Sequence, residues 1–342
     1  FRFCHEIVQA VVYRELGRWR RRMLHRRAGE VLGDLRPDNI SALARHFERA
    51  EEPGRAARYA MLAGQAARKV FAHIEGRAHF ERALALLAQE AETLREATSI
   101  ADNRRLQIEA LYGRGWALRL VGDMDTYAKD LKKVARVAES LNDAGALAHL
   151  RWREAYAHRW FCRYPEARTA AEEGVRLSRE AAEPLLEAQC WREIGMACRR
   201  EGDYGVARDA LEKALALSIA AGDVVHQIHA LGNLATLHWY LGEYQQALDL
   251  SLQSLTRCDE AGLPLERRLP LGDMGAAAAA LGNSALARQC LEESLSIARQ
   301  TADRTQEILC LLHLGWLSIR LKEPVEALDH LQVGLALAER IG

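Results

Sequence analysis

The chain lacks several features that would assign it quickly to a class. Its 342 residues carry 47 basic and 47 acidic side chains, and this zero net charge excludes a polyanion-coating protein. Aromatic residues make up 6%, prolines number seven, and no apolar run approaches the about 18 residues of a membrane span. The remainder is 49% hydrophobic and rich in alanine, leucine, glutamate and arginine, which excludes wholesale disorder and is typical of a helical protein.

Cysteine is also sparse, and its distribution excludes a disulfide framework. The seven cysteines are an odd number scattered through helical patterns, at positions 4, 162, 190, 198, 258, 290 and 310. Free thiols of this kind predict a reducing, cytoplasmic location. The chain opens at Phe1 without a methionine or a secretory leader, which predicts a piece of a longer polypeptide.

Motifs for catalysis and metal binding are missing as well. The sequence has no Gly-x-x-x-x-Gly-Lys-Ser/Thr phosphate loop, no His-Glu-x-x-His and no Cys-x-x-Cys. His226 and His229 could share a helix face, but a metal would need a further ligand, so ordinary surface histidines are the stronger interpretation. The sequence therefore predicts no catalytic residue, no metal site and no cofactor.

The strongest pattern is a repeat with a period of 40 residues. The motif Gly-x-Tyr-x-x-Ala is complete in two copies, which begin at Gly202 and Gly242. Degenerate copies begin at residues 122, 162, 282 and 322, so six copies follow one another without an insertion. A column of small residues precedes each copy by seven positions: Gly115, Ala155, Gly195, Ala235, Gly275 and Gly315.

Each repeat unit is predicted to be a helical hairpin. Apolar and small residues from Leu186 to Cys198 recur at the 3.6-residue spacing of one helix face. Gly202 ends that helix, and Tyr204 and Leu211 belong to the buried stripe of a second one. Because neither helix can bury its stripe alone, successive hairpins should stack around a continuous core.

The motif and its small-residue column resemble the tetratricopeptide repeat, in particular its variants with long helices. The resemblance implies an all-α fold, a right-handed superhelical solenoid of six helical hairpins over residues 104–342. Tyr127 in the first copy and Lys322 and Pro324 in the last depart from the pattern, as suits the ends of a regular array. A degenerate repeat and a connector are expected over residues 37–103, with a helix around residues 42–47 and about eleven extra residues near 90–103.

The first 36 residues resemble a linker found in large bacterial regulators. The residues that carry this resemblance are Phe1-Arg2-Phe3-x-His5-Glu6-Ile7 and, further on, Arg21-Arg22-x-Leu24-His25-Arg26. In LuxR-type and antibiotic-regulatory activators, and in some class III nucleotide cyclases, this pattern closes the helical and winged-helix part of a signal-transduction (STAND or AAA-type) ATPase domain. The resemblance implies that residues 1–36 are a remnant of that region and that the chain is a sensor arm.

Seven arginines crowd this first segment, with Glu15 opposing them: Arg14, Arg18, Arg20, Arg21, Arg22, Arg26 and Arg27. Such a cluster can contact nucleic-acid phosphates, or it can dock on the ATPase module of the parent chain or on another acidic neighbour. Because the resemblance places the segment beside the ATPase, docking is the favoured interpretation and direct nucleic-acid contact is not expected.

The resemblance also indicates which side chains line a concave groove. Ligand contacts in the family come mainly from first-helix positions three before, and one, four and five after, the small-residue column. These positions supply ten candidate groove residues: Tyr112, Trp116, Arg119, Trp152, Tyr156, Arg159, Trp160, Arg192, Arg199 and Trp239. Arg119, Arg159 and Arg199 recur at 40-residue spacing, and the mutual repulsion of three like charges favours an anionic guest.

Two interpretations of these residues remain open. In one, they form a groove in a non-enzymatic sensor and protein-interaction domain of a bacterial transcriptional regulator. Its guest would be an acidic peptide, a protein segment or a small anionic effector. In the other, the rings fill space between hairpins and the arginines pair with Glu154, Glu193 or Glu201, as in a scaffold or oligomerisation module. The regulatory arm of a nucleotide cyclase is a further alternative, and none of these functions requires a membrane.

Overall fold

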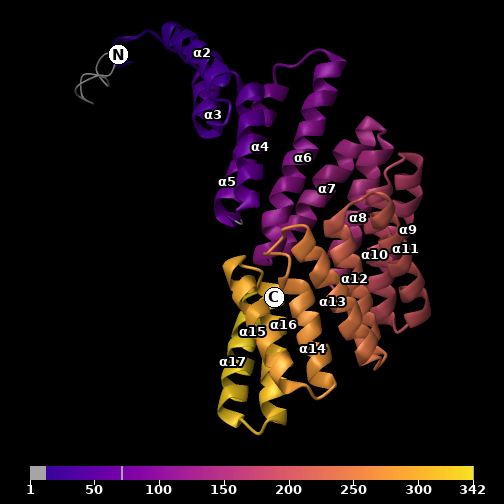
Figure 1. Cartoon of the computed structure of the whole chain (residues 1–342). Helices are drawn as coiled ribbons and strands as arrows, with labels where there is room; N and C mark the ends of the chain where they lie inside the picture. Colours follow the sequence, from indigo (N-terminus) through magenta and orange to yellow (C-terminus); the bar gives the residue numbers. More distant parts are fainter. Residues whose placement is uncertain (1–12, 71, 342) are drawn as a thin grey trace. The chain divides into compact units, whose positions relative to one another are not determined.

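The computed structural model describes residues 13–70 and 72–341, and its regular secondary structure there is helical (Figure 1). The helices, in chain order, are α2 (Arg18–Leu35), α3 (Ile40–Arg49), α4 (Pro53–Lys69), α5 (His73–Ala91), α6 (Ala97–Val121), α7 (Met124–Leu141), α8 (Ala144–Trp160), α9 (Tyr164–Glu180), α10 (Pro184–Glu201), α11 (Tyr204–Ala220), α12 (Val224–Tyr240), α13 (Tyr244–Glu260), α14 (Arg268–Ala280), α15 (Ser284–Gln300), α16 (Arg304–Arg320) and α17 (Pro324–Ile341). They form two compact units, residues 1–118 and residues 119–342. Cys4 and the Phe1–Ile7 part of the predicted linker lie outside the described residues.

The first unit contains α2 to α5 and most of α6. Its core gathers side chains from α3, α4, α5 and α6, with Phe47, Met61, Phe80, Leu87 and Ala110 among them. Helix α3 confirms the helix predicted around residues 42–47. The predicted extra residues are present as the turn at 92–96 and as additional length in α6, which has 25 residues where α8 has 17.

The second unit contains α7 followed by five antiparallel hairpins, from α8–α9 to α16–α17. These hairpins are the second to sixth predicted copies. The helix boundaries predicted around Gly202 are confirmed, because α10 ends at Glu201 and α11 begins at Tyr204. The all-α fold and the stacking of hairpins into a solenoid are therefore confirmed.

Left-handed residues separate the helices of the second unit at intervals of 20 residues. The positions are 122, 142, 162, 182, 202, 222, 242, 262, 282, 302 and 322, and their φ values lie between +48° and +87°. Glycine fills six of them because it adopts this conformation without strain, whereas Cys162 and Ala182 adopt it against their intrinsic preference. The next residue often caps the following helix, as Asp203 does by accepting a hydrogen bond from the Val206 N–H. These regular stops give successive hairpins the same 40-residue period, although α14, with 13 residues, is shorter than the other first helices.

The small-residue column marks the place where the two helices of a hairpin come closest. A Cβ atom on Gly195 would lie 2.6 Å from Cγ of Leu211, and Gly275 and Gly315 meet Leu291 and Leu331 in the same way. In the hairpins with alanine in the column, the residue sixteen positions later is Ala171 or Ser251 instead. Glycine in the column is thus matched by leucine on the second helix, and alanine by alanine or serine.

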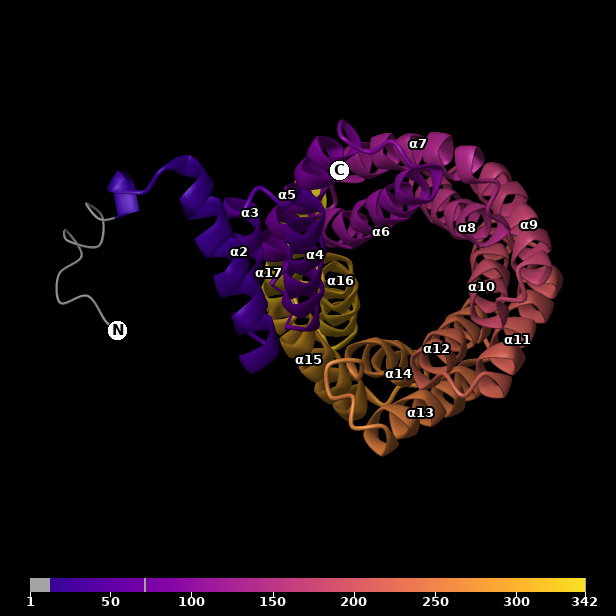
Figure 2. The same ribbon diagram turned by 90° about the horizontal axis from the view of Figure 1, so that it is seen from above.

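Within the second unit the first helices of the hairpins form an inner layer and the second helices an outer one (Figure 2). Each inner helix from α8 to α14 contacts the next inner helix, and these contacts exceed any between successive outer helices. Closer spacing on one side bends the array toward that side. The inner helices therefore line its concave face, as the repeat pattern predicts.

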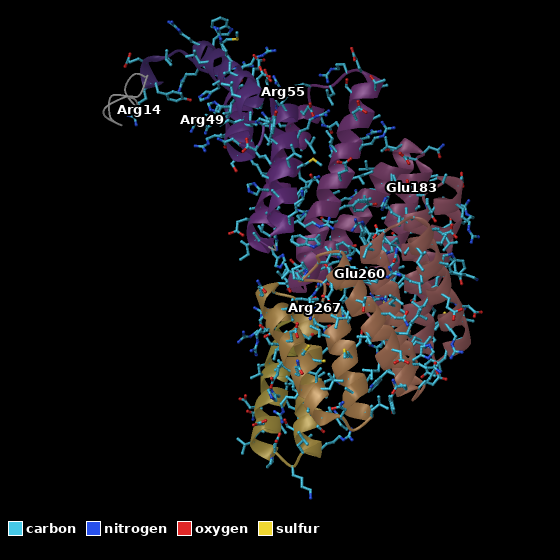
Figure 3. All side chains as sticks on the ribbon, in the orientation of Figure 1. Arg14, Arg49, Arg55, Glu183, Glu260 and Arg267 are labelled. Carbon is cyan, nitrogen blue, oxygen red and sulfur yellow. The ribbon has the colours of Figure 1, made fainter. Side chains whose placement is uncertain are left out.

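Small residues fill the core between the layers, and polar groups lie at the hairpin ends. Cys190 and Cys198 are buried in the cluster around Leu211, and the six cysteines among the described residues are free thiols. Glu183 lies at the start of α10 and Glu260 at the end of α13, both at hairpin turns (Figure 3). No described helix combines the length and apolar character that crossing a membrane requires.

Candidate functional site

The inner helices of the second unit bring together a group of cationic and aromatic side chains that we call the arginine cradle. Its members are Arg119, Tyr156, Arg159, Arg192, Glu193, Arg199 and Tyr240. They come from the end of α6 and from α8, α10 and α12, and therefore from successive inner helices. Four of the five charged members are arginines, so the cradle carries an excess of positive charge.

Tyr156 lies between two guanidinium groups. The Cζ atoms of Arg119 and Arg159 are 4.5 Å and 5.0 Å from the centroid of its ring. A cation over an aromatic face gains about 0.5–2 kcal/mol, depending on how far it is desolvated. The ring thus holds two arginines 40 residues apart in adjacent positions, as their spacing predicts.

Glu193 is the buried counter-ion of the cradle. Its carboxylate accepts a hydrogen bond from Nε of Arg159 at 2.8 Å and lies 3.6 Å from a terminal nitrogen of Arg192. Burial lowers the pKa of Arg192, and the charges of Arg159 and Arg119 lower it further, against the opposing effect of Glu193. One carboxylate therefore serves two arginines and leaves the crowding of positive charge incompletely relieved.

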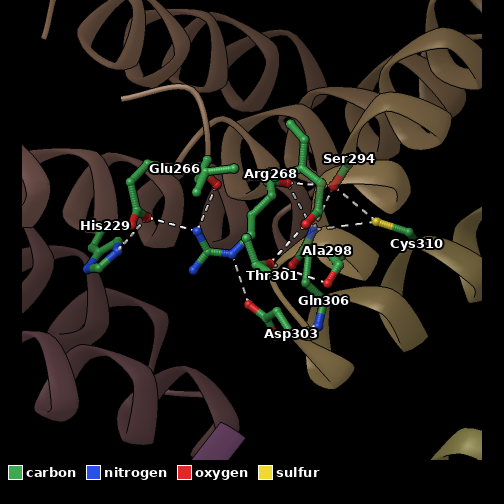
Figure 4. A network of polar contacts seen from close by, with 11 residues as sticks. His229, Glu266, Arg268, Ser294, Ala298, Thr301, Asp303, Gln306 and Cys310 are labelled. Atoms are coloured by element: carbon green, nitrogen blue, oxygen red, sulfur yellow. Dashed lines mark hydrogen bonds and ion pairs between the residues drawn. The ribbon is translucent and has the colours of Figure 1, made fainter. Parts of the chain in front are cut away.

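A chain of polar contacts continues from Arg192 toward the later hairpins (Figure 4 shows it from His229 onward). A terminal nitrogen of Arg192 lies 3.1 Å from Nδ1 of His229, and Nε2 of His229 lies 3.6 Å from Glu266. Because arginine can only donate, Nδ1 is the acceptor and Nε2 carries the proton, which makes the ring neutral. Burial likewise lowers the pKa of His229.

Glu266 is the centre of this chain, in the turn before α14. Burial raises its pKa, but the His229 hydrogen bond and the Arg268 charge outweigh that effect and hold the pKa at about 2. Arg268 also donates from Nε to Asp303 at 3.0 Å. The chain therefore joins α10, α12, α14 and the start of α16, which stiffens the array on its inner side.

Arg199 lies at the other edge of the cradle, where its charge acts on the carboxyl group of Asp273. Arg199 lies with its Cζ atom 4.8 Å from the centroid of the Tyr240 ring. Burial raises the pKa of Asp273 to about 7, although the Thr236 hydroxyl, 3.3 Å away, and the Arg199 charge favour its ionised form. A carboxyl group that is partly protonated at neutral pH neutralises Arg199 only in part.

Several hydrogen-bond donors of the inner helices have no acceptor among the described residues. They are Nε of Arg119, Nε of Arg192 and the indole nitrogens of Trp152 and Trp239, and all four atoms are buried. A buried N–H group without a partner costs about 1–3 kcal/mol. The two arginine Nε donors and the excess of arginine both favour a guest that supplies acceptors and negative charge.

Comparison with known proteins decides the nature of the hairpins. A family model for the tetratricopeptide repeat matches residues 186–260 and 267–340, which correspond to four of the hairpins described above. Residues 186–260 and 267–340 thus carry tetratricopeptide repeats. Tetratricopeptide repeats form protein-interaction domains, and the hairpin α8–α9 that precedes the matched residues has the same 20-residue spacing of helix starts. Among curated proteins, no sequence matches the chain significantly.

Solved structures with the same arrangement of repeats are similar to the chain in fold. A Rap protein complexed with Competence and Sporulation Factor is 13% identical, with a TM-score of 0.67 over 98% of this chain and 91% of that one. NprR in complex with its cognate peptide NprX is 16% identical, with a TM-score of 0.59 over 82% and 79%. A STAND protein with a tetratricopeptide-repeat sensor from Pyrococcus horikoshii is 16% identical, with a TM-score of 0.54 over 98% of this chain and 55% of that protein.

The remaining predicted groove residues occupy different settings. Trp152 packs against buried side chains of the second and third repeats, among them Leu177, Leu186 and Cys190, so its ring fills space between hairpins. Trp160 is half-buried at the end of α8. Trp239 lies against His313 of the sixth repeat, with 6.1 Å between ring centroids.

Two predicted groove residues belong to the first unit. Tyr112 is half-buried on α6, and the Trp116 ring meets the His73 ring edge-on with 4.8 Å between centroids. The guanidinium group of Arg68 lies 5.8 Å from the Trp116 ring. Within this unit Trp116 therefore packs against α4 and α5.

Three of the seven arginines of the predicted basic cluster, all on α2, form ion pairs within the first unit. Arg18 and Arg22 contact Glu51, while Arg26 contacts Glu30 and Glu52. These acids follow α3 or lie one turn away on α2, so Glu15 is not the main opposing charge. The cluster therefore offers less free positive charge than its sequence suggests.

Sequence reasoning named Glu193 as a possible partner of the arginines but missed His229 and Asp273 as members of this surface. The side chains that flank His229 and Asp273 in sequence are small or apolar, and that contrast was the available signal. The importance of all three comes from contacts with residues 34 to 37 positions away, which depend on how successive hairpins stack. Of the pairings considered in advance for the arginines, the cradle uses the one with Glu193.

Proposed function

We propose that the chain is the sensor domain of a bacterial multidomain regulator and binds an acidic peptide or protein segment in the arginine cradle. The observation that carries the proposal is a cluster of four arginines with one buried carboxylate, which contacts only Arg159 and Arg192, and with unpartnered Nε donors on Arg119 and Arg192. An acidic side chain or terminal carboxylate would supply both the missing charge and the missing acceptors. Each such charged contact contributes about 1.5–3 kcal/mol.

The structural relatives support a peptide as the guest. Two proteins of similar fold were solved with a bound partner, a Rap protein with Competence and Sporulation Factor and NprR with its cognate peptide NprX. The STAND relative carries its repeats as a sensor, which agrees with the resemblance of residues 1–36 to an ATPase-associated linker. The proposed role is binding, not catalysis, and the proposed setting is a cytoplasmic transcriptional regulator.

Binding in the cradle would act on the rest of the regulator through the array. A guest that contacts α6, α8 and α10 together favours one spacing of these helices over others, and so one curvature. The attached ATPase would respond if its active state prefers that curvature. Measuring ATP hydrolysis by the parent protein with and without a bound peptide tests this step, and an unchanged rate would contradict it.

The experiment for the cradle itself is selection from a random twelve-residue peptide library displayed on phage. We expect enrichment of peptides rich in Asp and Glu, and an affinity that falls as salt is raised. In fluorescence anisotropy with one enriched peptide, Arg119→Gln with Arg199→Gln should weaken binding at least about tenfold. Arg176→Gln on the outer helix α9 is the matched control and should change nothing.

Two results would overturn the proposal. One is the absence of any acidic preference among the selected peptides. The other is an equal affinity of the cradle variant and the Arg176→Gln control for the same peptide. Circular dichroism of both variants establishes that the helices are intact before affinities are compared.

A scaffold or oligomerisation module is the second candidate, and α17 favours it. Val325, Leu328 and Leu335 of this helix are exposed by 81%, 57% and 61%. Such a face can pack against another copy of the chain. Sedimentation velocity distinguishes the candidates, because a scaffold would form a stable oligomer that Leu328→Ser with Leu335→Ser dissociates while peptide binding stays unchanged.

A further inference from the structure

The chemistry of the concave face changes along the second unit. Four positions of each inner helix lie along one stripe of its surface. Counted from the residue in the small-residue column, two of them come six and three residues earlier and two come one and four residues later. The stripe consists of His149, Trp152, Tyr156 and Arg159 on α8, of Gln189, Arg192, Met196 and Arg199 on α10, of His229, Gly232, Thr236 and Trp239 on α12, of Leu269, Gly272, Ala276 and Ala279 on α14, and of Leu309, Leu312, Trp316 and Ile319 on α16. The face therefore passes from aromatic and cationic, through small, to large and apolar.

The stripe on α16, which we call the apolar stripe, is exposed. Leu309, Leu312, Trp316 and Ile319 keep 44%, 39%, 66% and 54% of their surface in contact with solvent. They fall within one arc of the helix over a length of roughly 15 Å, given a rise of about 1.5 Å per residue. The opposite face of α16, with Leu311 and Leu314, supplies the core of the hairpin. Four large apolar side chains side by side exceed scattered exposure and mark a contact surface.

The apolar stripe and the arginine cradle lie on the same layer of inner helices. Helices α12, α14 and α16 follow one another on the inner side of the array (Figure 2), and α14 contacts both of its neighbours. Small side chains at Ala276 and Ala279 leave room above α14. The Trp239 ring from α12 and the His313 ring from α16 meet there at 6.1 Å. The concave face is thus continuous from the cradle to the apolar stripe.

We propose that the apolar stripe is a second subsite for the guest of the arginine cradle, and that this guest is an extended peptide with acidic residues at one end and bulky apolar residues at the other. The inference rests on the proposed function of the cradle. Charge selects one end of such a peptide and burial of apolar side chains selects the other, so the two subsites together fix its direction. A small anion or a uniformly acidic segment would leave the apolar stripe unused.

The spacing of the helices sets the spacing of the anchors. Packed helices lie about 8–10 Å apart, so three steps from α10 to α16 cover roughly 25–30 Å along the face. An extended chain advances about 3.3 Å per residue. The acidic and apolar anchors should therefore be about seven to nine residues apart, and somewhat fewer where the curvature shortens the path.

The test selects peptides from the random twelve-residue phage library twice, once on the wild-type chain and once on a double variant with Trp316→Ala and Ile319→Ser. Wild type should select peptides that combine acidic residues with Trp, Phe, Leu or Ile at the predicted distance. The variant should still select acidic peptides but lose the apolar preference. Leu252→Ser on the outer helix α13, where Leu252 is 50% exposed, is the matched control and should select the wild-type sequences.

Anisotropy measurements with one selected peptide then isolate the second subsite. Trp316→Ala should weaken binding of the full peptide about tenfold and leave unchanged a version whose apolar anchors are replaced by serine. Acidic selection without an apolar preference would overturn the second subsite and leave the cradle intact, whereas selection without acidic residues would overturn the cradle. Self-association of wild type that Trp316→Ala abolishes would assign the stripe to a second copy and also overturn the inference.

Discussion

Arg159 on α8 donates from Nε to the carboxylate of Glu193 on α10, across the junction of two repeats. The Glu193 side chain has no exposure to water, whereas Arg159 keeps 25% of its side chain exposed. The pair therefore joins the second and third repeats and also holds one arginine of the cradle in position. The same contact therefore serves both the stability of the array and the geometry of the proposed binding site.

Removal of Arg159 leaves the buried Glu193 carboxylate with a more distant partner, Arg192. We expect Arg159→Met to lower the free energy of unfolding by about 2–4 kcal/mol. Glu193→Leu in the same chain should recover part of this loss, with a coupling energy of about 1–3 kcal/mol in a double-mutant cycle. Urea unfolding followed by circular dichroism provides the measurement.

The exposed pair Arg176 and Glu173 on α9 is the control for that cycle. Its coupling energy should stay below about 1 kcal/mol because water screens the pair. Strictly additive losses at positions 159 and 193 would show that their contact contributes nothing to stability.

Gly195 should tolerate no side chain unless its partner shrinks. Gly195→Ala places a Cβ atom 2.6 Å from Leu211, and the resulting overpacking should destabilise the chain by about 1–3 kcal/mol despite the better helix propensity of alanine. Leu211→Ala added to Gly195→Ala should relieve the clash and make the second substitution less harmful than it is alone. Gly205→Ala on α11 is the control, because a Cβ atom there would have no neighbouring atom nearer than 4.0 Å. Equal losses of stability for the Gly195 and Gly205 variants in thermal unfolding would contradict the close approach at Gly195.

Ala182 adopts a left-handed backbone at φ +54°, where an L-residue with a Cβ atom is strained. We expect Ala182→Gly to raise the free energy of unfolding by about 0.5–1 kcal/mol, the relief of strain less the added freedom of the unfolded chain. The neighbouring Ala181 has φ −80°, so Ala181→Gly should be neutral or destabilising. Unfolding curves of the two variants test this prediction. A lower free energy of unfolding for Ala182→Gly would show that the strain is absent.

Asp273 should make stability depend on pH. Because burial raises its pKa to about 7, the folded chain binds more protons than the unfolded chain between about pH 4 and pH 7. The stabilisation from this group is therefore present at low pH and lost as the pH rises through that window. Asp273→Asn should gain stability relative to wild type on going from about pH 5 to about pH 8, and a difference independent of pH would refute the assignment.

The sequence was sufficient to predict the hairpins because their boundaries are local. A left-handed stop at Gly202 or Gly242 and an apolar stripe of fixed period specify a helix pair without reference to the rest of the chain. The stops at Cys162 and Ala182 follow the same geometry without glycine, and only the period identified the first of them. Local signals thus account for nearly all of the fold.

The candidate site was predictable only in part, because its contacts cross between hairpins. The 40-residue spacing predicted that Arg119 and Arg159 lie together, and both do flank Tyr156. The same reasoning left open whether Trp152 lines a groove or fills space between hairpins, and its ring packs between two repeats. Whether a ring points into a groove or a core depends on side-chain volumes in the neighbouring hairpin, which a spacing rule does not contain.

The matching of side-chain size between Gly195 and Leu211, and between Ala155 and Ala171, affects how such arrays can gain or lose repeats. Each first helix fits the second helix of its own hairpin, so a leucine opposite Ala155 would collide with it and an alanine opposite Gly195 would leave a void. Duplication or recombination that breaks the gene at a turn between hairpins, such as the one at Gly222, keeps each small-column residue together with its matching residue on the second helix. The hairpin, not the single helix, is therefore the heritable building block of this protein.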